Sequence, residues 1–225
     1  MCDERKQAIR QQARSKRHER REHELAARGL ETGAGKGPFS PAESLPCEIH
    51  PEGSALMEAW RGLLRSLRLT YADLLPALFL PTPTEPDIRL LFSAVSHCLV
   101  PALVGEDGCR LPDPAWVMWD APSVEALPRP LEILGAPMSP EVLRQADIVL
   151  LPALAVDEDG TRIGQGGGWY DRALKHARPG APIVAVIFDD EWSAQPLPRL
   201  SHDVCVDAVV APGGFRILTS DLSSA

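Results

Sequence analysis

The feature that most constrains the fold is the apolar run DIVLLPALAV at residues 147–156. A short run of this kind, bounded by polar residues, is typical of a strand that is buried on both faces. In parallel sheets, helices cover those two faces. The run therefore predicts a central strand of an α/β sheet, with its C-terminal end at the edge where ligands bind in such folds.

The rest of the chain alternates between strand-like and helix-like segments. Short apolar runs predict further strands at residues 77–80, 99–104, 116–119, 183–188 and 206–210. Helical spacing, helix-forming residues and a Ser-Pro-Glu start at residue 139 predict helices at residues 3–28, 54–68 and 87–98, after 139, and at 170–177. We expect a single α/β domain of three layers, α/β/α, with a mostly parallel sheet and flanking helices.

The charge of the 225-residue chain, −8 in total, is unevenly distributed. Residues 1–30 hold nine Lys or Arg against five Asp or Glu, whereas the remainder holds 14 against 26. A basic segment on an acidic body is typical of an anion-binding arm. We expect four parts: a basic helical arm at 1–30, packed on the site or closing over it, a Gly/Pro-rich connection at 31–53, the α/β domain at 54–217 and a tail at 218–225.

The composition argues against several other classes of protein. No apolar run approaches the roughly 20 residues that span a bilayer, and the charged N-terminal residues lack the apolar stretch of a secretory signal. The five cysteines are scattered and form no CxxC pair, which is typical of free thiols in a reducing compartment. The acidic body is a poor surface for nucleic acid. We therefore expect a cytoplasmic protein with neither membrane nor nucleic-acid partners.

The segment DEDGTRIGQGGGWYDR at residues 157–172 carries the clearest chemical signal. Glycine tolerates positive φ and allows a ligand close to the backbone, and a Gly-rich loop between a strand and a helix exposes N–H groups to an anion. Arg162 adds a fork of donors that suits phosphate, and Asp171, at the start of the expected helix, is a carboxylate that can hold Mg²⁺. The loop glycines are Gly164, Gly166, Gly167 and Gly168.

Two common phosphate-binding motifs are absent from this segment. The chain contains no Gly-Lys-Ser/Thr, and a GxGxxG fingerprint would require glycine at the position of Trp169. A tight turn capped by Asp171 is therefore an alternative reading of the glycine cluster alone.

The order of residues in this segment resembles the hallmark of the 5-formyltetrahydrofolate cyclo-ligases, also called methenyltetrahydrofolate synthetases. That hallmark is a strand ending in Pro-x-Leu-(Ala/Gly)-x-Asp, then Gly-x-Arg-Leu-Gly-x-Gly-x-Gly-Tyr-Tyr-Asp. The chain reads PALAVD at residues 152–157 and GTRIGQGGGWYD at residues 160–171, with Trp169 in place of the first tyrosine. The match is long and specific.

Further positions match the same family in the same order. Lys6 and Arg10 fit the Lys-x-x-x-Arg of its first helix, and Glu85 fits a glutamate that follows its first strand. Asp203 fits an aspartate that precedes a Val-Asp strand near the C-terminus. The resemblance covers nearly the whole chain and is weakest over residues 105–145.

The resemblance implies ATP-dependent cyclisation of 5-formyltetrahydrofolate to 5,10-methenyltetrahydrofolate, with release of ADP and phosphate, through a phosphorylated formyl intermediate. The implied partners are these two small-molecule substrates, and we expect a monomer. Mg²⁺ would be the cofactor, bound by Asp171 and Asp203. Glu85 and Trp169 would face the folate. Lys6, Arg10 and Arg162 would be catalytic. The ATP-binding residues would be Lys6, Arg10, Arg162, Gly164, Gln165, Gly166, Gly167, Gly168, Trp169 and Tyr170.

Several of these residues have simpler interpretations. Lys6 and Arg10 lie four residues apart and share one helix face, but such a pair on a basic helix is also typical of solvated charges. Glu85 lies beside Thr84-x-x-Asp87, which resembles a helix capping box. His202 has no obvious partner that would make it a catalytic base. Two other functions stay open: a nucleotide- or folate-binding homologue without turnover, and a nucleic-acid protein that uses the basic first helix.

Overall fold

The computed structural model describes residues 2–27, 29, 51–71, 74–120, 127, 131–132 and 135–219. Within them, the α-helices are α1 (Cys2–Ala27), α2 (Pro51–Ser66), α3 (Arg89–Phe92) and α4 (Trp169–Ala173). Three 3-10 helices are η3 (Pro140–Gln145), η4 (Leu174–His176) and η5 (Asp189–Glu191). The strands are β1 (Pro76–Ala77), β2 (His97–Val104), β3 (Arg110–Asp120), β4 (Ile148–Pro152), β5 (Ala155–Asp157), β6 (Arg162–Ile163), β7 (Ile183–Val186), β8 (Trp192–Ser193), β9 (Ala208–Ala211) and β10 (Gly214–Ile217).

The main sheet has seven strands among the described residues, in the order β10-β9-β7-β4-β1-β2-β3. The five inner strands are parallel, and β10 and β3 add antiparallel edges. β4 is the middle strand. A small sheet, ordered β6-β5-β8, stands apart from the main one. The predicted α/β fold with a mostly parallel sheet is confirmed, as is the central place of the strand that begins residues 147–156.

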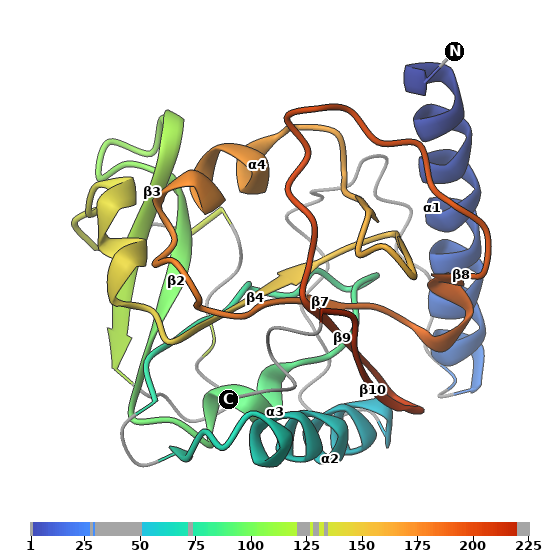
Figure 1. The fold of residues 1–225 in the computed structure, drawn as a ribbon, viewed down its shortest axis with the longest axis horizontal. Helices are drawn as coiled ribbons and strands as arrows, with labels where there is room; N and C mark the ends of the chain where they lie inside the picture. The colour runs from blue at the N-terminus through green and yellow to red at the C-terminus, as the bar shows by residue number, and fades with distance from the viewer. Residues whose placement is uncertain are drawn as a thin grey trace.

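Alternate side chains of β4 face two separate cores, which explains its continuous apolar sequence. Ile148 and Leu150 pack in the core that also contains apolar residues of α2 and α3, whereas Val149 and Leu151 pack in the core that contains residues of η3, α4 and η4. Figure 1 shows α2 and α3 below the sheet and α4 above it. The predicted three layers are therefore present.

The run at residues 147–156 is not one strand, as expected, but two strands in different sheets. β4 ends at Pro152, whose ring nitrogen has no hydrogen to donate to a ladder. Ala153 N still donates to Val186 of β7 (3.3 Å), but Leu154 N donates to Ile163 of β6 (2.7 Å). The chain therefore passes from the main sheet to the small sheet within two residues.

Other predicted elements differ in extent. The helix expected at 87–98 is reduced to the four residues of α3, because the chain turns at Ser93 and enters β2 at residue 97. The strand expected at 77–80 keeps ladder pairing only at Pro76–Ala77, and the one at 116–119 is part of the longer β3. The helix after residue 139 is the 3-10 helix η3, and Ser139 makes no side-chain capping bond. β10 was not predicted.

The helix expected at residues 3–28 is present as α1, and it stands beside the small sheet rather than on the main one (Figure 1). Ala13 and Ile9 pack there against Leu154 and Ile163. Arg17 reaches the carbonyl oxygen of Ala153, just after the end of β4 (2.5 Å). α1 therefore covers the C-terminal edge of the parallel strands. Residues 31–50 of the predicted connection (31–53) and residues 220–225 of the predicted tail (218–225) lie outside the described residues. The predicted division of the chain stays a prediction.

A buried ion pair fastens α1 to the body. Arg17 Nε and Nη2 donate to the two carboxylate oxygens of Glu191 at 2.6 and 2.8 Å. The two side chains are only 2% and 4% exposed. The guanidinium carbon of Arg20 lies 3.9 Å from the centroid of the Phe188 ring, which adds a cation–π contact beside the pair. Geometry of this quality, with both carboxylate oxygens engaged, holds the two segments in one register.

We expect Arg17→Ala to release α1 from the body. The substitution leaves Glu191 buried with only the backbone N–H of Phe188 as a donor, and breaking a buried pair in this way costs about 3–5 kcal/mol. The melting temperature should fall, and trypsin should cleave within α1 under native conditions. Lys16→Ala is the matched control, because Lys16 makes only an exposed 3.4 Å pair with Asp190. Native trypsin resistance in Arg17→Ala would contradict this role.

Candidate functional site

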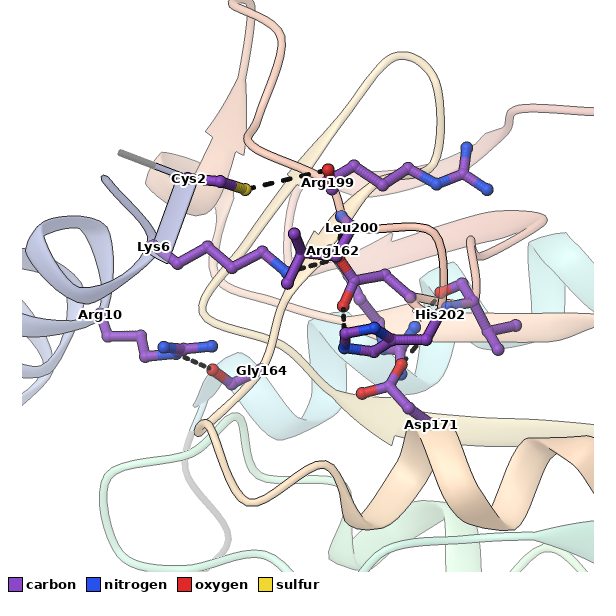
Figure 2. Close-up of polar contacts among 11 residues, drawn as sticks. Cys2, Lys6, Arg10, Arg162, Gly164, Asp171, Arg199, Leu200 and His202 are labelled. Carbon is purple, nitrogen blue, oxygen red and sulfur yellow. Dashed lines mark hydrogen bonds and ion pairs between the residues drawn. The ribbon is translucent and has the colours of Figure 1, made fainter. Parts of the chain in front are cut away.

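Arg162 and Asp171 form one ion pair where β6, α4 and the irregular segment before β9 approach one another. Arg162 is buried on β6, and its Nη2 donates to Asp171 Oδ1 at 2.6 Å. Its Nη1 donates to the carbonyl oxygen of Val204, and the N–H of Val204 donates to the same Asp171 oxygen at 3.3 Å. Figure 2 shows Arg162 directly above Asp171. Asp171 therefore binds Arg162 and Val204, and the N-cap of α4 is Gly168, so the alternative of a turn capped by Asp171 is not supported.

A second ion pair brings α1 to the same place. Lys6, which is 4% exposed, donates to Asp203 Oδ2, and the N–H of Leu200 donates to the same oxygen at 2.6 Å. Burial disfavours the charged carboxylate, but the bonds from Lys6 and Leu200 outweigh it, so the pKa of Asp203 lies below its ordinary value. Lys6 is therefore not a solvated surface charge.

The two pairs lie next to each other because Asp203 and Val204 are neighbours in the chain. Two cations, Lys6 and Arg162, thus face two carboxylates, Asp171 and Asp203, in a cluster that is formally neutral. His202 adjoins it, but its Nε2 is 3.9 Å from Asp203 Oδ1 and its side chain is 67% exposed. The cluster has charges of both signs that suit a metal–phosphate ligand, whereas His202 is not held as a catalytic base.

Residues 164–168, the glycine loop, follow β6 and lead into α4. Arg10 Nε donates to the carbonyl oxygen of Gly164 at 3.0 Å. Figure 2 shows Arg10 and Lys6 extending side by side from α1, toward Gly164 and toward the segment around His202. Gly166 and Gly168 have φ of +98° and +62°, values that side chains resist, whereas Gly164 and Gly167 do not. The sequence reading of this loop as one that requires glycine is therefore confirmed at two positions.

Arg14 also holds the glycine loop, and sequence reasoning missed it. Its Nε donates to Gln165 Oε1 at 3.0 Å and its Nη2 to the carbonyl oxygen of Gln165 at 2.7 Å. The signal was present, because Arg14 continues the four-residue spacing of Lys6 and Arg10 along one face of α1. Beyond the loop, Arg172 Nη1 donates to the carbonyl oxygen of Gly167 at 3.1 Å.

Several carbonyls of the glycine loop accept hydrogen bonds from arginine side chains, whereas its N–H groups differ in having no such partner among the described residues. Across the described part of the chain, no residue accepts a hydrogen bond from the backbone N–H groups of residues 165–168. α4 that follows has only five residues, so a helix dipole adds little to the field here. The loop itself, and not the helix, therefore offers donors to an anion.

Three aromatic side chains stand beside the loop. Trp169 makes edge-to-face contacts with Trp116 (5.2 Å between ring centroids) and with Tyr170 (4.9 Å). Burial raises the pKa of Tyr170, the charge of Glu85 raises it further, and the charge of Arg162 opposes both. Tyr170 therefore stays protonated at neutral pH and lies within electrostatic reach of both Glu85 and Arg162.

Glu85 does not serve the helix start. Its Oε2 accepts from the N–H of Thr82 at 2.9 Å and closes a turn of residues 82–85, while Asp87 binds the guanidinium of Arg89 at 2.7 and 2.8 Å. The N-cap of α3 is Ile88, so the capping box considered at Thr84 and Asp87 is absent. The half-buried carboxylate of Glu85 lies within electrostatic reach of Tyr170.

Asp171 and Asp203 together form a partial donor set of the kind that Mg²⁺ uses. The described residues contain no group of three or more His, Cys, Asp or Glu placed to hold a metal. Asp171 Oδ1 and Asp203 Oδ2 each engage a cation. Asp171 Oδ2 and Asp203 Oδ1, which lies 3.9 Å from the exposed His202 Nε2, are the oxygens that can turn to another ligand. Mg²⁺ is commonly held by one or two carboxylates, with waters and substrate phosphates completing its shell. The donor set therefore fits Mg²⁺ only together with a phosphate-bearing substrate.

No helix among the described residues is long and apolar enough to cross a membrane.

Comparisons with known proteins, by sequence and by fold, find relatives in one family of enzymes. The 5-formyltetrahydrofolate cyclo-ligase family matches residues 78–212. The chain is 35% identical to the 5-formyltetrahydrofolate cyclo-ligase of Mycolicibacterium smegmatis over 167 residues, which is 72% of this chain and 83% of that protein.

Two solved structures share the fold. The 5,10-methenyltetrahydrofolate synthetase of Aquifex aeolicus aligns with a TM-score of 0.60 at 20% identity, over 96% of this chain and 93% of its own. That of Mycoplasma pneumoniae aligns with a TM-score of 0.54 at 16% identity, over 91% and 97%. Because both identities are low, these two similarities support the three-layer fold and nothing beyond it.

Proposed function

The chain belongs to the 5-formyltetrahydrofolate cyclo-ligase family, and we propose that it uses ATP to convert 5-formyltetrahydrofolate to 5,10-methenyltetrahydrofolate, with release of ADP and phosphate. The observation that carries the ATP half of this proposal is the glycine loop. The carbonyls of Gly164, Gln165 and Gly167 are held by arginine side chains, while the N–H groups of residues 165–168 bond to no described residue. Buried cations at Lys6 and Arg162 stand in the adjoining cluster.

The proposed reaction proceeds in two steps. The formyl oxygen on N5 attacks the γ-phosphorus of ATP, the bond to the β–γ bridging oxygen breaks, and ADP leaves. The product of this step is an imidate phosphate. N10 then attacks its formyl carbon and loses its proton to solvent, the C–O bond breaks, and phosphate leaves as the ring closes. Phosphorylation is needed because the oxygen of an amide is a poor leaving group. The protein's share is to position the two substrates and to neutralise charge.

The cations would act by exchanging partners. In the structure, Lys6 pairs with Asp203 and Arg162 pairs with Asp171. A triphosphate that enters the cluster offers these cations new anionic partners, with Arg10, the glycine loop and the aromatic pair Trp169 and Tyr170 completing the ATP site. Mg²⁺ held by Asp171 and Asp203 would supply charge neutralisation between the phosphates. The freed carboxylates are then available to it.

The folate would lie on the side of Glu85 and Trp169. A pterin is flat and is bound well by aromatic walls, and the indole of Trp169 is fixed between Trp116 and Tyr170. The indole has no phenol hydroxyl, so hydrogen bonding to the pterin would fall to other groups. The carboxylate of Glu85, within electrostatic reach of Tyr170, is the candidate that the family resemblance names.

The decisive experiment is a turnover assay with purified protein, 5-formyltetrahydrofolate and MgATP. Methenyl absorbance should rise with ATP and stay flat without it. A folded protein that binds nucleotide but produces no methenyl product would exclude turnover and favour the alternative of a non-catalytic nucleotide- or folate-binding homologue. A binding assay with RNA or DNA at low salt tests the alternative that α1 binds nucleic acid. Analytical sedimentation tests whether the protein is a monomer, as expected. The cytoplasmic location stays a prediction.

We expect Asp171→Ala to lower turnover at limiting Mg²⁺ and excess Mg²⁺ to restore part of it. Removing one of two carboxylate ligands weakens a hard-cation site without abolishing the nucleotide pocket. The measurement is the rate as a function of Mg²⁺ concentration at fixed ATP. Asp159→Ala removes an exposed carboxylate of the same segment and serves as the control. An unchanged Mg²⁺ dependence in Asp171→Ala would limit Asp171 to its bonds with Arg162 and Val204.

A further inference from the structure

We propose that Arg14 is a positioning residue for the glycine loop: it fixes the peptide that follows Gln165 so that the N–H of Gly166 faces the phosphates. This inference rests on the proposed use of ATP. It concerns a residue outside the matched Lys6 and Arg10 pair, and it assigns Arg14 a contact with the protein rather than with the nucleotide.

The contact is specific to one residue of the loop. Arg14 Nη2 donates to the main-chain oxygen of Gln165 at 2.7 Å, and Nε donates to its side-chain Oε1 at 3.0 Å. Both donors come from the planar guanidinium fork, so the two bonds together fix the orientation of Gln165 relative to α1. A lysine at this position would offer a point charge without that orientation.

The direction of the peptide follows from its planarity. In a trans peptide, the carbonyl oxygen of one residue and the N–H of the next point in opposite directions. Because Arg14 holds the carbonyl of Gln165 toward α1, the N–H of Gly166 points away from α1. Arg10 does the same for the preceding peptide by holding the carbonyl of Gly164. Two successive N–H groups are thereby turned to the side opposite the helix, where no described residue accepts from them.

The backbone at Gly166 agrees with this arrangement. Its φ of +98° is one that side chains resist, and a Cβ there would lie 3.4 Å from the guanidinium carbon of Arg10. Such a Cβ would make an ordinary contact with Arg10, so the positive φ, and not a lack of space, is what requires glycine here. Without Arg14, the peptide after Gln165 is free to rotate, since Gln165, Gly166 and Gly167 are all exposed.

Attachment of α1 to the body does not require Arg14. The buried pair of Arg17 with Glu191 and the pair of Lys6 with Asp203 fasten the helix on either side of it. Arg14 itself is exposed and bonds to the loop alone among the contacts described. Its loss should therefore change the loop and leave the fold intact, which separates a positioning role from a structural one.

The experiment compares Arg14→Ala, Arg14→Lys and Lys16→Ala with the unaltered protein. Affinity for the non-hydrolysable analogue AMP-PNP with Mg²⁺ is measured by calorimetry, together with the KM values for ATP and for 5-formyltetrahydrofolate and the melting temperature. Arg14→Ala should weaken AMP-PNP binding and raise the KM for ATP about fivefold, the scale of exposed charge-assisted hydrogen bonds. The KM for 5-formyltetrahydrofolate and the melting temperature should stay unchanged, and Lys16→Ala should match the unaltered protein throughout.

Arg14→Lys should restore part of the affinity, because a lysine can reach the carbonyl but cannot orient it. Gln165→Ala removes only the side-chain bond and should have a small effect, and Gln165→Ala combined with Arg14→Ala should equal Arg14→Ala alone. If the unaltered protein turns over and Arg14→Ala binds AMP-PNP equally well, the inference is overturned while the proposed function stands. If the unaltered protein binds no nucleotide, both fail. If Arg14→Ala lowers the melting temperature and raises the KM values for ATP and for 5-formyltetrahydrofolate equally, the inference is overturned, and the role of Arg14 is to dock α1 on the body.

Discussion

Replacement of Gly168 by valine is expected to lower kcat/KM for ATP about a hundredfold, because a misplacement of about 1 Å at a reacting group costs on that order. Gly168 has φ +62°, and a Cβ there would lie 3.4 Å from the guanidinium of Arg172, which holds the neighbouring carbonyl of Gly167. The Cβ itself would make an ordinary contact, so the valine acts through strain at this positive φ and through the γ carbons that it adds beside Arg172. The strain itself costs of order 1–3 kcal/mol, which a domain of this size can survive.

Gly108→Val is the matched control for that strain. Gly108 has φ +75° in the turn between β2 and β3, where a Cβ would meet nothing within 4 Å. It should lower the melting temperature by a similar amount and leave kcat/KM for ATP nearly unchanged. Equal activity losses in the two variants, or a loss in Gly168→Val that follows its unfolding curve, would show the glycine loop to be a turn without a phosphate role.

Arg162→Met is expected to lower kcat about 10³-fold, the lower end of what an arginine contributes to phosphoryl transfer. Methionine keeps most of the buried volume but removes the cation and the two donors that bind Asp171 and Val204. If Arg162 acts on charge that develops in the transition state, kcat should fall more than the affinity for AMP-PNP. Arg162→Lys should recover only part of the rate, because it restores charge without the fork.

Folding has to be controlled in the same experiment, since Arg162→Met leaves the Asp171 carboxylate without its cation. Arg162→Met combined with Asp171→Asn removes both charges, so its melting temperature should exceed that of Arg162→Met alone while its activity stays low. Arg178→Met, which removes an exposed pair with Asp147, is the control for loss of an arginine. Recovery of activity in the double variant would assign Arg162 to the fold and not to the reaction.

The neutral cluster of Lys6, Arg162, Asp171 and Asp203 has a consequence for how α1 behaves. The first helix was expected as an arm that packs on the site or closes over it, and the structure has it docked through Lys6 and through the buried Arg17–Glu191 pair. Binding of a phosphate ligand would change the partners of Lys6 but not those of Arg17. If the chain uses ATP as proposed, α1 would then change its contacts at its N-terminal end while its middle stays attached.

The sequence alone was sufficient for those features that depend on local pattern. The double-sided apolar run of β4 required helices on both faces, and the glycines at 166 and 168 marked backbone that only glycine adopts easily. The order of Arg162, the loop and Asp171 pointed to a phosphate site because strand, loop and acid follow one another along the chain. Features of this kind depend on the chemistry and spacing of residues that are close together in the chain, so the sequence is enough to predict them.

The tertiary structure decided the features that join distant residues. Pro152 and the competing partners Val186 and Ile163 split residues 147–156 between two sheets, and an apolar pattern carries no information about which partner wins. The contacts of Arg17 with Glu191 and of Arg14 with Gln165 join residues 174 and 151 positions apart. On a helix with few apolar residues, the sequence does not distinguish a buried arginine from a solvated one, because only the docked position of α1 removes its side chain from water and supplies the acceptors.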